Sequence, residues 1–134
     1  AGLPTHVVFE EASATEQPLE LARRVLSQKE NRPTAVLCYA DADTLNMFVA
    51  ARELGLSLPD DLSIAGFLFD NVQTQALGLG GMFLRNYVVG RTAVDLLLHR
   101  IENPEAGSQR SRTVQHEWRS ARTIGPAPHA ISRC

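Results

Sequence analysis

The arrangement that most constrains the fold is a pair of apolar runs separated by a helical pattern within residues 34–67. The first run, TAVLCY at 34–39, and the second, LSIAGF at 62–67, are apolar on both of their faces. Strands of that kind occur in parallel sheets whose faces are covered by helices. A strand, a helix and a second strand in this order form a βαβ unit, whose crossover is right-handed. We therefore predict an α/β fold built on a parallel sheet.

The crossover between these strands has the pattern of an amphipathic helix. Asp41 or Asp43 is suited to cap its beginning, and Gly55 is suited to end it. An earlier helix is predicted over residues 16–28, with Thr15 as its cap. The apolar residues at helical spacing along the crossover helix are Leu45, Phe48, Val49 and Leu54.

The second half of the chain has weaker patterns. Residues 68–81 are expected to form a long irregular connection, and loops of that length are often functional. A third helix is predicted to be capped by Asn86 and to end at Asn103-Pro104, and residues 113–118 are predicted to form a last strand. The buried face expected for the third helix consists of Val94, Leu97, Leu98 and Ile101.

Length and composition are those of one globular domain. The 134 residues are 44% hydrophobic and 21% charged, close to the average soluble protein. We expect residues 1–125 to fold and residues 126–134, which begin in a Pro-rich run, to form a disordered tail. The net charge is −2, whereas a surface that binds nucleic acid is usually basic. We therefore expect no DNA binding by these residues themselves.

Three features of the sequence indicate the cellular compartment of the protein. The two cysteines, Cys38 and Cys134, are too few for a disulfide framework, which fits a reducing cytoplasm. The first residues contain no basic segment that leads into an apolar stretch, so no secretory signal is expected. The longest uncharged stretch, residues 71–84, is too short and too rich in glycine to cross a bilayer. We expect a cytoplasmic protein with no membrane partner.

No group of residues has the spacing of a catalytic or metal site. The four histidines, at positions 6, 99, 116 and 129, are far apart, and none has a ligand or a triad partner at a suitable spacing. The glycine-rich run at 78–81 lacks the Lys-Ser/Thr ending of a phosphate-binding loop. We therefore expect no enzymatic activity, no metal and no cofactor.

The predicted topology itself marks a candidate ligand site. In open parallel sheets, ligands bind at the carboxyl ends of the strands, which here are residues 39–41 and 67–71. The first end also lies at a helix N-terminus, which favours polar or anionic groups. A helix cap is the simpler interpretation of Asp41, and core or subunit packing is the simpler one for the apolar residues. The candidate site residues are Tyr39, Asp41, Phe67, Leu68, Phe69 and Asp70.

Three motifs in fixed order resemble those of the lactose-repressor (LacI-type) family of bacterial transcription regulators. They are RPTAVLCYAD at 32–41, ARELGLSLPDDLSIAGF at 51–67 and GRTAVDLLLHRIE at 90–102. The family patterns are approximately RPTAVxxxND, AxxExGxxVPxDVSVxGFDD and GxxAxxLLLxxIE. The resemblance covers residues 15–125 with one small gap, and the spacing of the three motifs agrees.

The resemblance implies an N-terminal helix-turn-helix followed by a two-lobed sensor like that of periplasmic binding proteins. This chain resembles the second lobe, a three-layer α/β unit, so the DNA-binding segment and the first lobe are expected to lie outside it. The resemblance also implies a small-molecule effector and a homodimer, with DNA contacted only through the segment outside the chain. The implied dimer face comprises Leu45, Phe48, Val49, Val72, Gln75, Ala76 and Leu77.

The sequence departs from the family pattern at the positions that contact effectors. Ala40 replaces the usual Asn, Leu68 replaces the Asp that follows Gly-Phe, and Leu84 replaces a Gln. A sugar hydroxyl left unpaired in a buried site costs about 1–3 kcal/mol. The usual sugar is therefore not favoured, and we consider a sugar-like effector, a smaller or less polar one, or none. A lobe of a solute-binding transport protein remains an open alternative, whereas the lack of a phosphate-binding loop and of a catalytic pair argues against a flavodoxin-like enzyme.

Overall fold

The computed structural model describes residues 15–105 and 111–127. The predicted tail at 126–134 lies almost wholly outside these ranges. In chain order, the elements are α1 (Pro18–Leu26), β1 (Ala35–Cys38), α2 (Asp41–Glu53), β2 (Ser63–Leu68), α3 (Val72–Leu77), β3 (Gly80–Phe83), α4 (Asn86–Glu102) and β4 (Glu117–Arg119).

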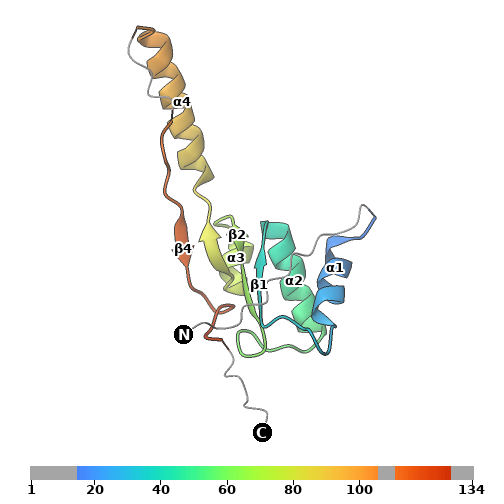
Figure 1. The fold of residues 1–134 in the computed structure, drawn as a ribbon. Helices are drawn as coiled ribbons and strands as arrows, with labels where there is room; N and C mark the ends of the chain where they lie inside the picture. Colours follow the sequence, from blue (N-terminus) through green and yellow to red (C-terminus); the bar gives the residue numbers. More distant parts are fainter. Residues whose placement is uncertain (1–14, 106–110, 128–134) are drawn as a thin grey trace, which may run out of the picture.

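The four strands form one sheet in the order β1-β2-β3-β4. Strands β1, β2 and β3 are parallel, and β4 pairs antiparallel to β3. Helices α1 and α2 lie beside the sheet on the side of β1 (Figure 1). The predicted parallel βαβ unit is confirmed as β1-α2-β2, and the α/β fold with it. The last strand is shorter than predicted, because only residues 117–119 pair with β3.

The main core lies between β1, β2 and the two helices α1 and α2. On α2 the buried residues are small or unbranched, and they are Thr44, Met47, Ala50 and Ala51. The apolar residues whose spacing predicted this helix lie elsewhere on it: Leu45 and Phe48 are half-buried, and Val49 and Leu54 are exposed. The face of α2 that approaches β2 needs small residues, because a Cβ on Gly66 would already overlap the Thr44 side chain. Phe48 is half-buried and packs against this core.

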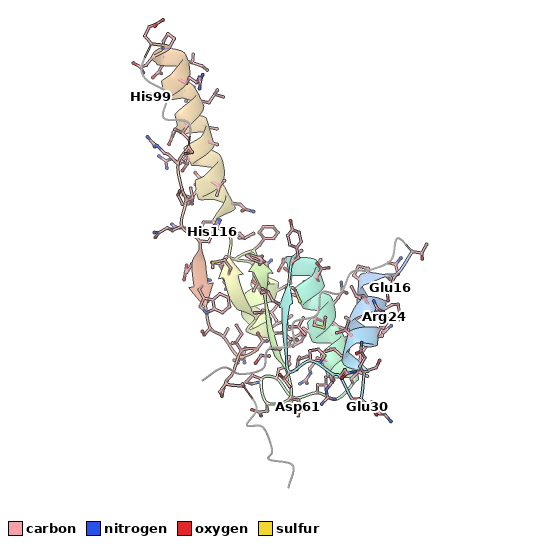
Figure 2. All side chains as sticks on the ribbon, in the orientation of Figure 1. Glu16, Arg24, Glu30, Asp61, His99 and His116 are labelled. Carbon is pink, nitrogen blue, oxygen red and sulfur yellow. The ribbon has the colours of Figure 1, made fainter. Side chains whose placement is uncertain are left out.

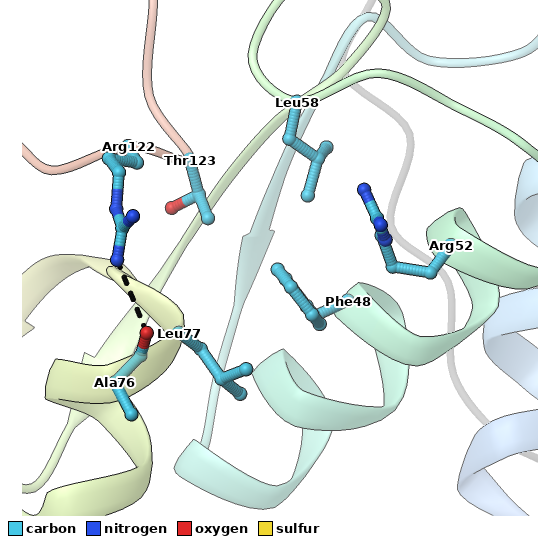
Figure 3. A pocket seen from close by; sticks show the side chains of 7 residues that line it. All are labelled: Phe48, Arg52, Leu58, Ala76, Leu77, Arg122 and Thr123. Atoms are coloured by element: carbon cyan, nitrogen blue, oxygen red, sulfur yellow. Dashed lines mark hydrogen bonds between the residues drawn. The ribbon is translucent and has the colours of Figure 1, made fainter.

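A second core cluster consists of Leu68, Leu79 and Phe83, all of which are buried. Leu45 and Phe48 of α2 and Leu77 of α3 pack against this cluster. Phe48 and Leu77 also line one cavity between their helices (Figure 3). The second cluster thus joins α2 and α3 to the same face of the sheet.

Residues 68–81 are not the irregular connection that the sequence analysis predicted, because they contain helix α3. A capping box starts this helix: the Asn71 side chain accepts a hydrogen bond from the backbone N–H of Thr74 at 2.9 Å, and the Thr74 hydroxyl accepts one from the backbone N–H of Asn71 at 3.3 Å. The six residues of α3 are too few to show a hydrophobic period.

The helix starts also differ from those predicted. Helix α1 begins at Pro18 with Gln17 as its cap, so Thr15 does not cap it. Glu16, outside the helix, instead accepts a hydrogen bond from Arg24 at 3.0 Å (Figure 2). Asp41 is the first residue of α2, whose cap is Ala40 and has no side-chain cap bond. The cap of α4 is Arg85, and Asn86 is likewise the first residue of its helix.

Helix α4 differs most from the prediction. It extends away from the sheet beyond the carboxyl ends of the strands (Figure 1). None of its residues is buried, and the residues predicted to form its buried face, from Val94 to Ile101, are 49–65% exposed. The apolar spacing correctly predicted the helix, but no element in the described part of the chain covers its apolar face. Among the described residues, no helix is long and apolar enough to cross a membrane.

Candidate functional site

The structure brings the two predicted strand ends together at one edge of the sheet. Strand β1 ends at Cys38 and the adjacent parallel strand β2 ends at Leu68, so the residues after them are neighbours. The Asn71 side-chain amide donates a hydrogen bond to Asp41 Oδ2 at 3.3 Å, which links the two ends directly. Residues 39–41 and 67–71 therefore form one surface, which we call the carboxyl edge.

Asp41 is the carboxylate of this edge that has a free acceptor atom. Its Oδ1 is buried and has no hydrogen-bond partner among the described residues. The position at the first residue of the thirteen-residue helix α2 favours the negative charge, because the helix dipole is positive there. A buried oxygen without a donor costs free energy, so a donor group of a ligand would be bound favourably.

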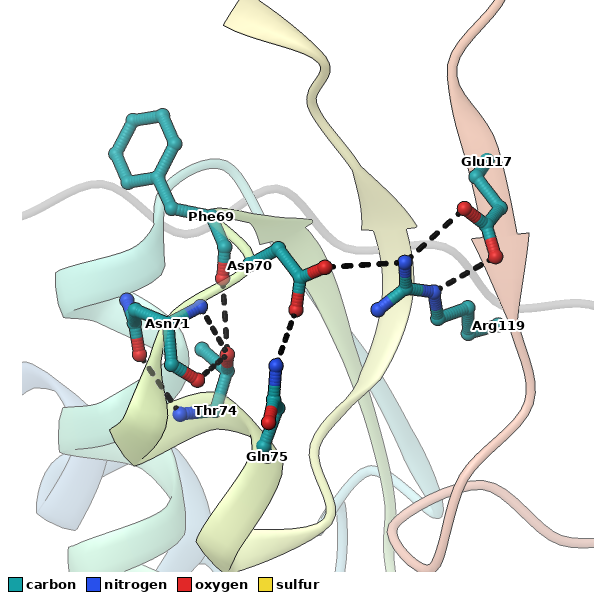
Figure 4. A network of polar contacts seen from close by, with 7 residues as sticks. All are labelled: Phe69, Asp70, Asn71, Thr74, Gln75, Glu117 and Arg119. Carbon is teal, nitrogen blue, oxygen red and sulfur yellow. Dashed lines mark hydrogen bonds and ion pairs between the residues drawn. The ribbon is translucent and has the colours of Figure 1, made fainter.

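Asp70, in contrast, is already bound by two side chains (Figure 4). Its Oδ1 accepts a hydrogen bond from Gln75 at 2.8 Å, and its Oδ2 accepts one from Arg119 at 3.1 Å. Arg119 and, to a smaller extent, Gln75 lower the pKa of Asp70. The stabilisation from this charge is therefore present above the ordinary pKa of an aspartate and is lost as the pH falls through the lowered value.

Arg119 is a member of the site that the sequence analysis missed. It makes two hydrogen bonds to Glu117, at 2.8 and 3.0 Å, and its guanidinium lies 4.4 Å from the centre of the Phe83 ring. Arg119 lies 49 positions after Asp70, and the two meet because β4 pairs with β3. The sequence contains no local signal for this pairing, since β4 has only three residues.

The apolar residues of the carboxyl edge divide into two groups. Tyr39 is 88% exposed, and Phe67 and Phe69 are also exposed. Leu68 is fully buried in the second core cluster, because successive residues of a strand point to opposite faces of the sheet. The structure thus separates Leu68 from the other five candidate effector residues.

The residues predicted to form a dimer face lie on α2 and α3, two helices that pack together through the second core cluster. Three of them, Leu45, Phe48 and Leu77, are half-buried against that cluster. The others are exposed, and they are Val49, Val72, Gln75 and Ala76.

Within the described ranges, no group of three or more His, Cys, Asp or Glu side chains is placed to hold a metal ion. His116 accepts a hydrogen bond from the backbone N–H of Arg85 at 3.2 Å near the base of α4, whereas His99 lies far along that helix (Figure 2). His6 and His129 lie outside the described residues. Burial raises the pKa of the Cys38 thiol to about 11, so it stays protonated and unreactive at neutral pH.

Comparisons with known proteins agree with this architecture. Residues 1–120 match the model of the family described as "Periplasmic binding protein-like domain". Over 105 residues, which are 76% of this chain and 30% of the relative, the chain is 35% identical to the HTH-type transcriptional repressor PurR of Haemophilus influenzae. The chain spans less than a third of the length of the curated relatives compared here.

Solved structures give the same result. A LacI family transcriptional regulator from Bifidobacterium animalis subsp. lactis superposes with a TM-score of 0.72 and 26% identity, over 82% of this chain and 40% of that one. A LacI family regulator from an Arthrobacter species, solved in complex with lactose, superposes with a TM-score of 0.65 and 26% identity, over 81% of this chain and 41% of that one. These proteins are regulators, and none of them is named as an enzyme or a transport protein. The chain therefore belongs to the periplasmic-binding-protein-like domain family, in the form found in the effector-binding domains of LacI-type regulators.

Proposed function

We propose that this chain is the effector-binding and dimer-forming part of a longer LacI-type repressor whose DNA-binding segment lies outside the 134 residues. Two observations support the proposal. The chain spans only 30% of a repressor and 40% of a regulator that it resembles. The apolar face of α4 is exposed over several turns, and exposed apolar surface of this extent is typical of a surface that another part of a protein covers.

The effector site of this proposal is the carboxyl edge. The observation that carries it is the unpartnered, buried Oδ1 of Asp41, on the same edge of the sheet as the exposed side chains of Tyr39, Phe67 and Phe69. Asp70 contributes through its contacts with Arg119 and Gln75 rather than through a free oxygen. Leu68 supports the edge from the core and does not contact the effector.

These groups favour an effector with an apolar face and a hydrogen-bond donor. Aromatic side chains bind flat apolar surfaces, and a small number of polar groups fixes the orientation of the ligand. A free carboxylate oxygen accepts a hydrogen bond, most strongly from a charged donor such as an ammonium group. An aromatic amine fits this arrangement better than a polyol does.

The test is release of DNA by the longer regulator. A duplex selected by the regulator from a random library is labelled, and ribose, lactose and tyramine are compared as ligands by fluorescence anisotropy. We expect tyramine to have the strongest effect, and Asp41→Ala and Phe67→Ala each to raise the ligand concentration needed at least tenfold. Asp43→Ala is the matched control, because Asp43 lies in the same helical turn and carries the same charge. A wild-type response from both Asp41→Ala and Phe67→Ala would contradict the assignment.

The dimer of this proposal forms through α2 and α3. Val72 of the predicted face is 81% exposed, so Val72→Glu disturbs little packing within one chain. We expect this substitution to convert a dimer into a monomer in multi-angle light scattering, because a charge in an apolar interface is not solvated. Leu54→Glu, an exposed apolar position outside the face, should leave the dimer intact. A monomeric wild-type protein, or a dimer unchanged by Val72→Glu, would argue against this interface.

A further inference from the structure

The cavity lined by Phe48 and Leu77 lies at the opposite end of the sheet from the carboxyl edge. It has a volume of about 240 Å³ and lies between α2, α3 and the segment that follows β4 (Figure 3). Thr123, which lines it, is hydrogen-bonded to Ile64 and Gly80 at the starts of β2 and β3. The cavity is therefore separate from the surface that contains Asp41.

The lining of this cavity combines apolar walls with two positive charges. Phe48, Leu58 and Leu77 provide the apolar surface. Arg52, in the last turn of α2, and Arg122 stand on opposite sides of Phe48 (Figure 3). Together they give the cavity one apolar region with a guanidinium at each side.

Neither arginine is neutralised within the described part of the chain. Arg122 donates one side-chain hydrogen bond, to the backbone oxygen of Ala76 at 3.2 Å, and the Arg52 side chain makes none among the described residues. The ion pairs of the described residues are made instead by other arginines, among them Arg23 and Arg119. A guanidinium group beside a cavity that no carboxylate lines favours an anion next to it.

We propose that this cavity binds a small organic anion whose apolar body lies on Phe48, Leu58 and Leu77 and whose carboxylate is held by Arg52 at one side of them. Arg122, at the other side and hydrogen-bonded to Ala76, adds only positive potential. Arginine binds carboxylates through parallel hydrogen bonds from its planar guanidinium. The volume lies below the roughly 300–1,000 Å³ of drug-sized ligand pockets, so the ligand has the size of a small metabolite. This site goes beyond the proposed function, which assigns it no ligand. It uses none of the residues of the carboxyl edge, but it shares Phe48, Ala76 and Leu77 with the proposed dimer face.

Isothermal titration calorimetry of the full chain tests the proposal, with benzoate as the probe. Benzyl alcohol has the same ring without the charge, and inorganic phosphate has charge without an apolar body. We expect benzoate to bind more tightly than either, Arg52→Gln to weaken its binding at least tenfold, and Arg122→Gln to weaken it less. Arg91→Gln, at an exposed position on α4, and Asp41→Ala should leave benzoate binding unchanged. The Asp41→Ala result separates this site from the effector site.

Four results would overturn the proposal. Equal binding of phosphate and benzoate would show that the arginines attract any anion, and equal binding of benzyl alcohol would show that the charge has no role. Absence of benzoate binding in the wild type would also refute it. If benzoate bound only to the Val72→Glu monomer, the natural occupant of the cavity would be a second copy of the chain.

Discussion

Gly81→Ala is expected to lower the free energy of unfolding by about 3 kcal/mol or more. The φ of Gly81 is 148°, a conformation that residues with a side chain rarely adopt. A Cβ at this position would also overlap the backbone oxygen of Gly66, the residue opposite it on β2. Because β2 is an interior strand that pairs on both sides, its backbone has no room to move away. Urea unfolding followed by circular dichroism measures the loss.

Gly90→Ala is the matched control for this prediction. Gly90 is exposed within α4, and a Cβ added there would meet no atom within 4 Å. Alanine is the better helix former, so we expect this variant to be more stable than the wild type by roughly 0.5–1 kcal/mol. Equal stabilities of Gly81→Ala and the wild type would show that β2 and β3 are not as close as the structure has them.

Thr123→Val is expected to cost about 2–3 kcal/mol of stability, although valine has the same shape as threonine. The Thr123 hydroxyl is buried between two strands. It accepts a hydrogen bond from the backbone N–H of Gly80 at 2.9 Å and donates one to the backbone oxygen of Ile64 at 2.8 Å. Valine would leave both backbone groups buried without a partner. These bonds attach the segment after β4 to the starts of β2 and β3.

Thr123→Ser keeps the hydroxyl and removes only a methyl group. It should therefore lose about 1 kcal/mol, the free energy of burying one such group. The two variants are compared by urea unfolding under the same conditions. Equal losses from Thr123→Val and Thr123→Ser would mean that the hydroxyl does not bridge the strands.

Local sequence patterns correctly predicted those elements whose burial is visible in the order of apolar and polar residues. The runs at 34–39 and 62–67 are apolar on both faces, and they became β1 and β2. Helix α3 was missed because six residues carry no period, although Asn71 and Thr74 have the spacing of a capping box. The exposure of α4 was not predictable, since apolar spacing identifies a face to be covered but not whether the covering surface is in the chain.

The sequence predicted the part of the candidate site that follows from the order of the parallel strands. Because the carboxyl ends of parallel strands meet at one edge, Asp41 and Asn71 were expected to be neighbours, and they are hydrogen-bonded. The period of two along β2 would have excluded Leu68, which has the opposite orientation to Phe67. The contact of Arg119 with Asp70 depends on the pairing of β3 with β4, which no local sequence pattern indicates.

Both carboxylate oxygens of Asp70 already accept hydrogen bonds, and this affects how an effector could bind. A ligand that used Asp70 as an acceptor would have to displace Arg119 or Gln75 from it. At Asp41 Oδ1 a ligand would displace no hydrogen-bond donor of the described residues, although it would have to move the atoms that bury this oxygen. We therefore assign the first polar contact of the effector to Asp41.

A crystal structure of the longer regulator with the effector identified by DNA release tests this assignment most directly. We expect a donor atom of the effector within about 3 Å of Asp41 Oδ1 and an apolar face of the effector against Phe67 or Phe69. An effector bound away from the carboxyl edge, with Asp41 Oδ1 hydrogen-bonded to another part of the protein, would contradict it.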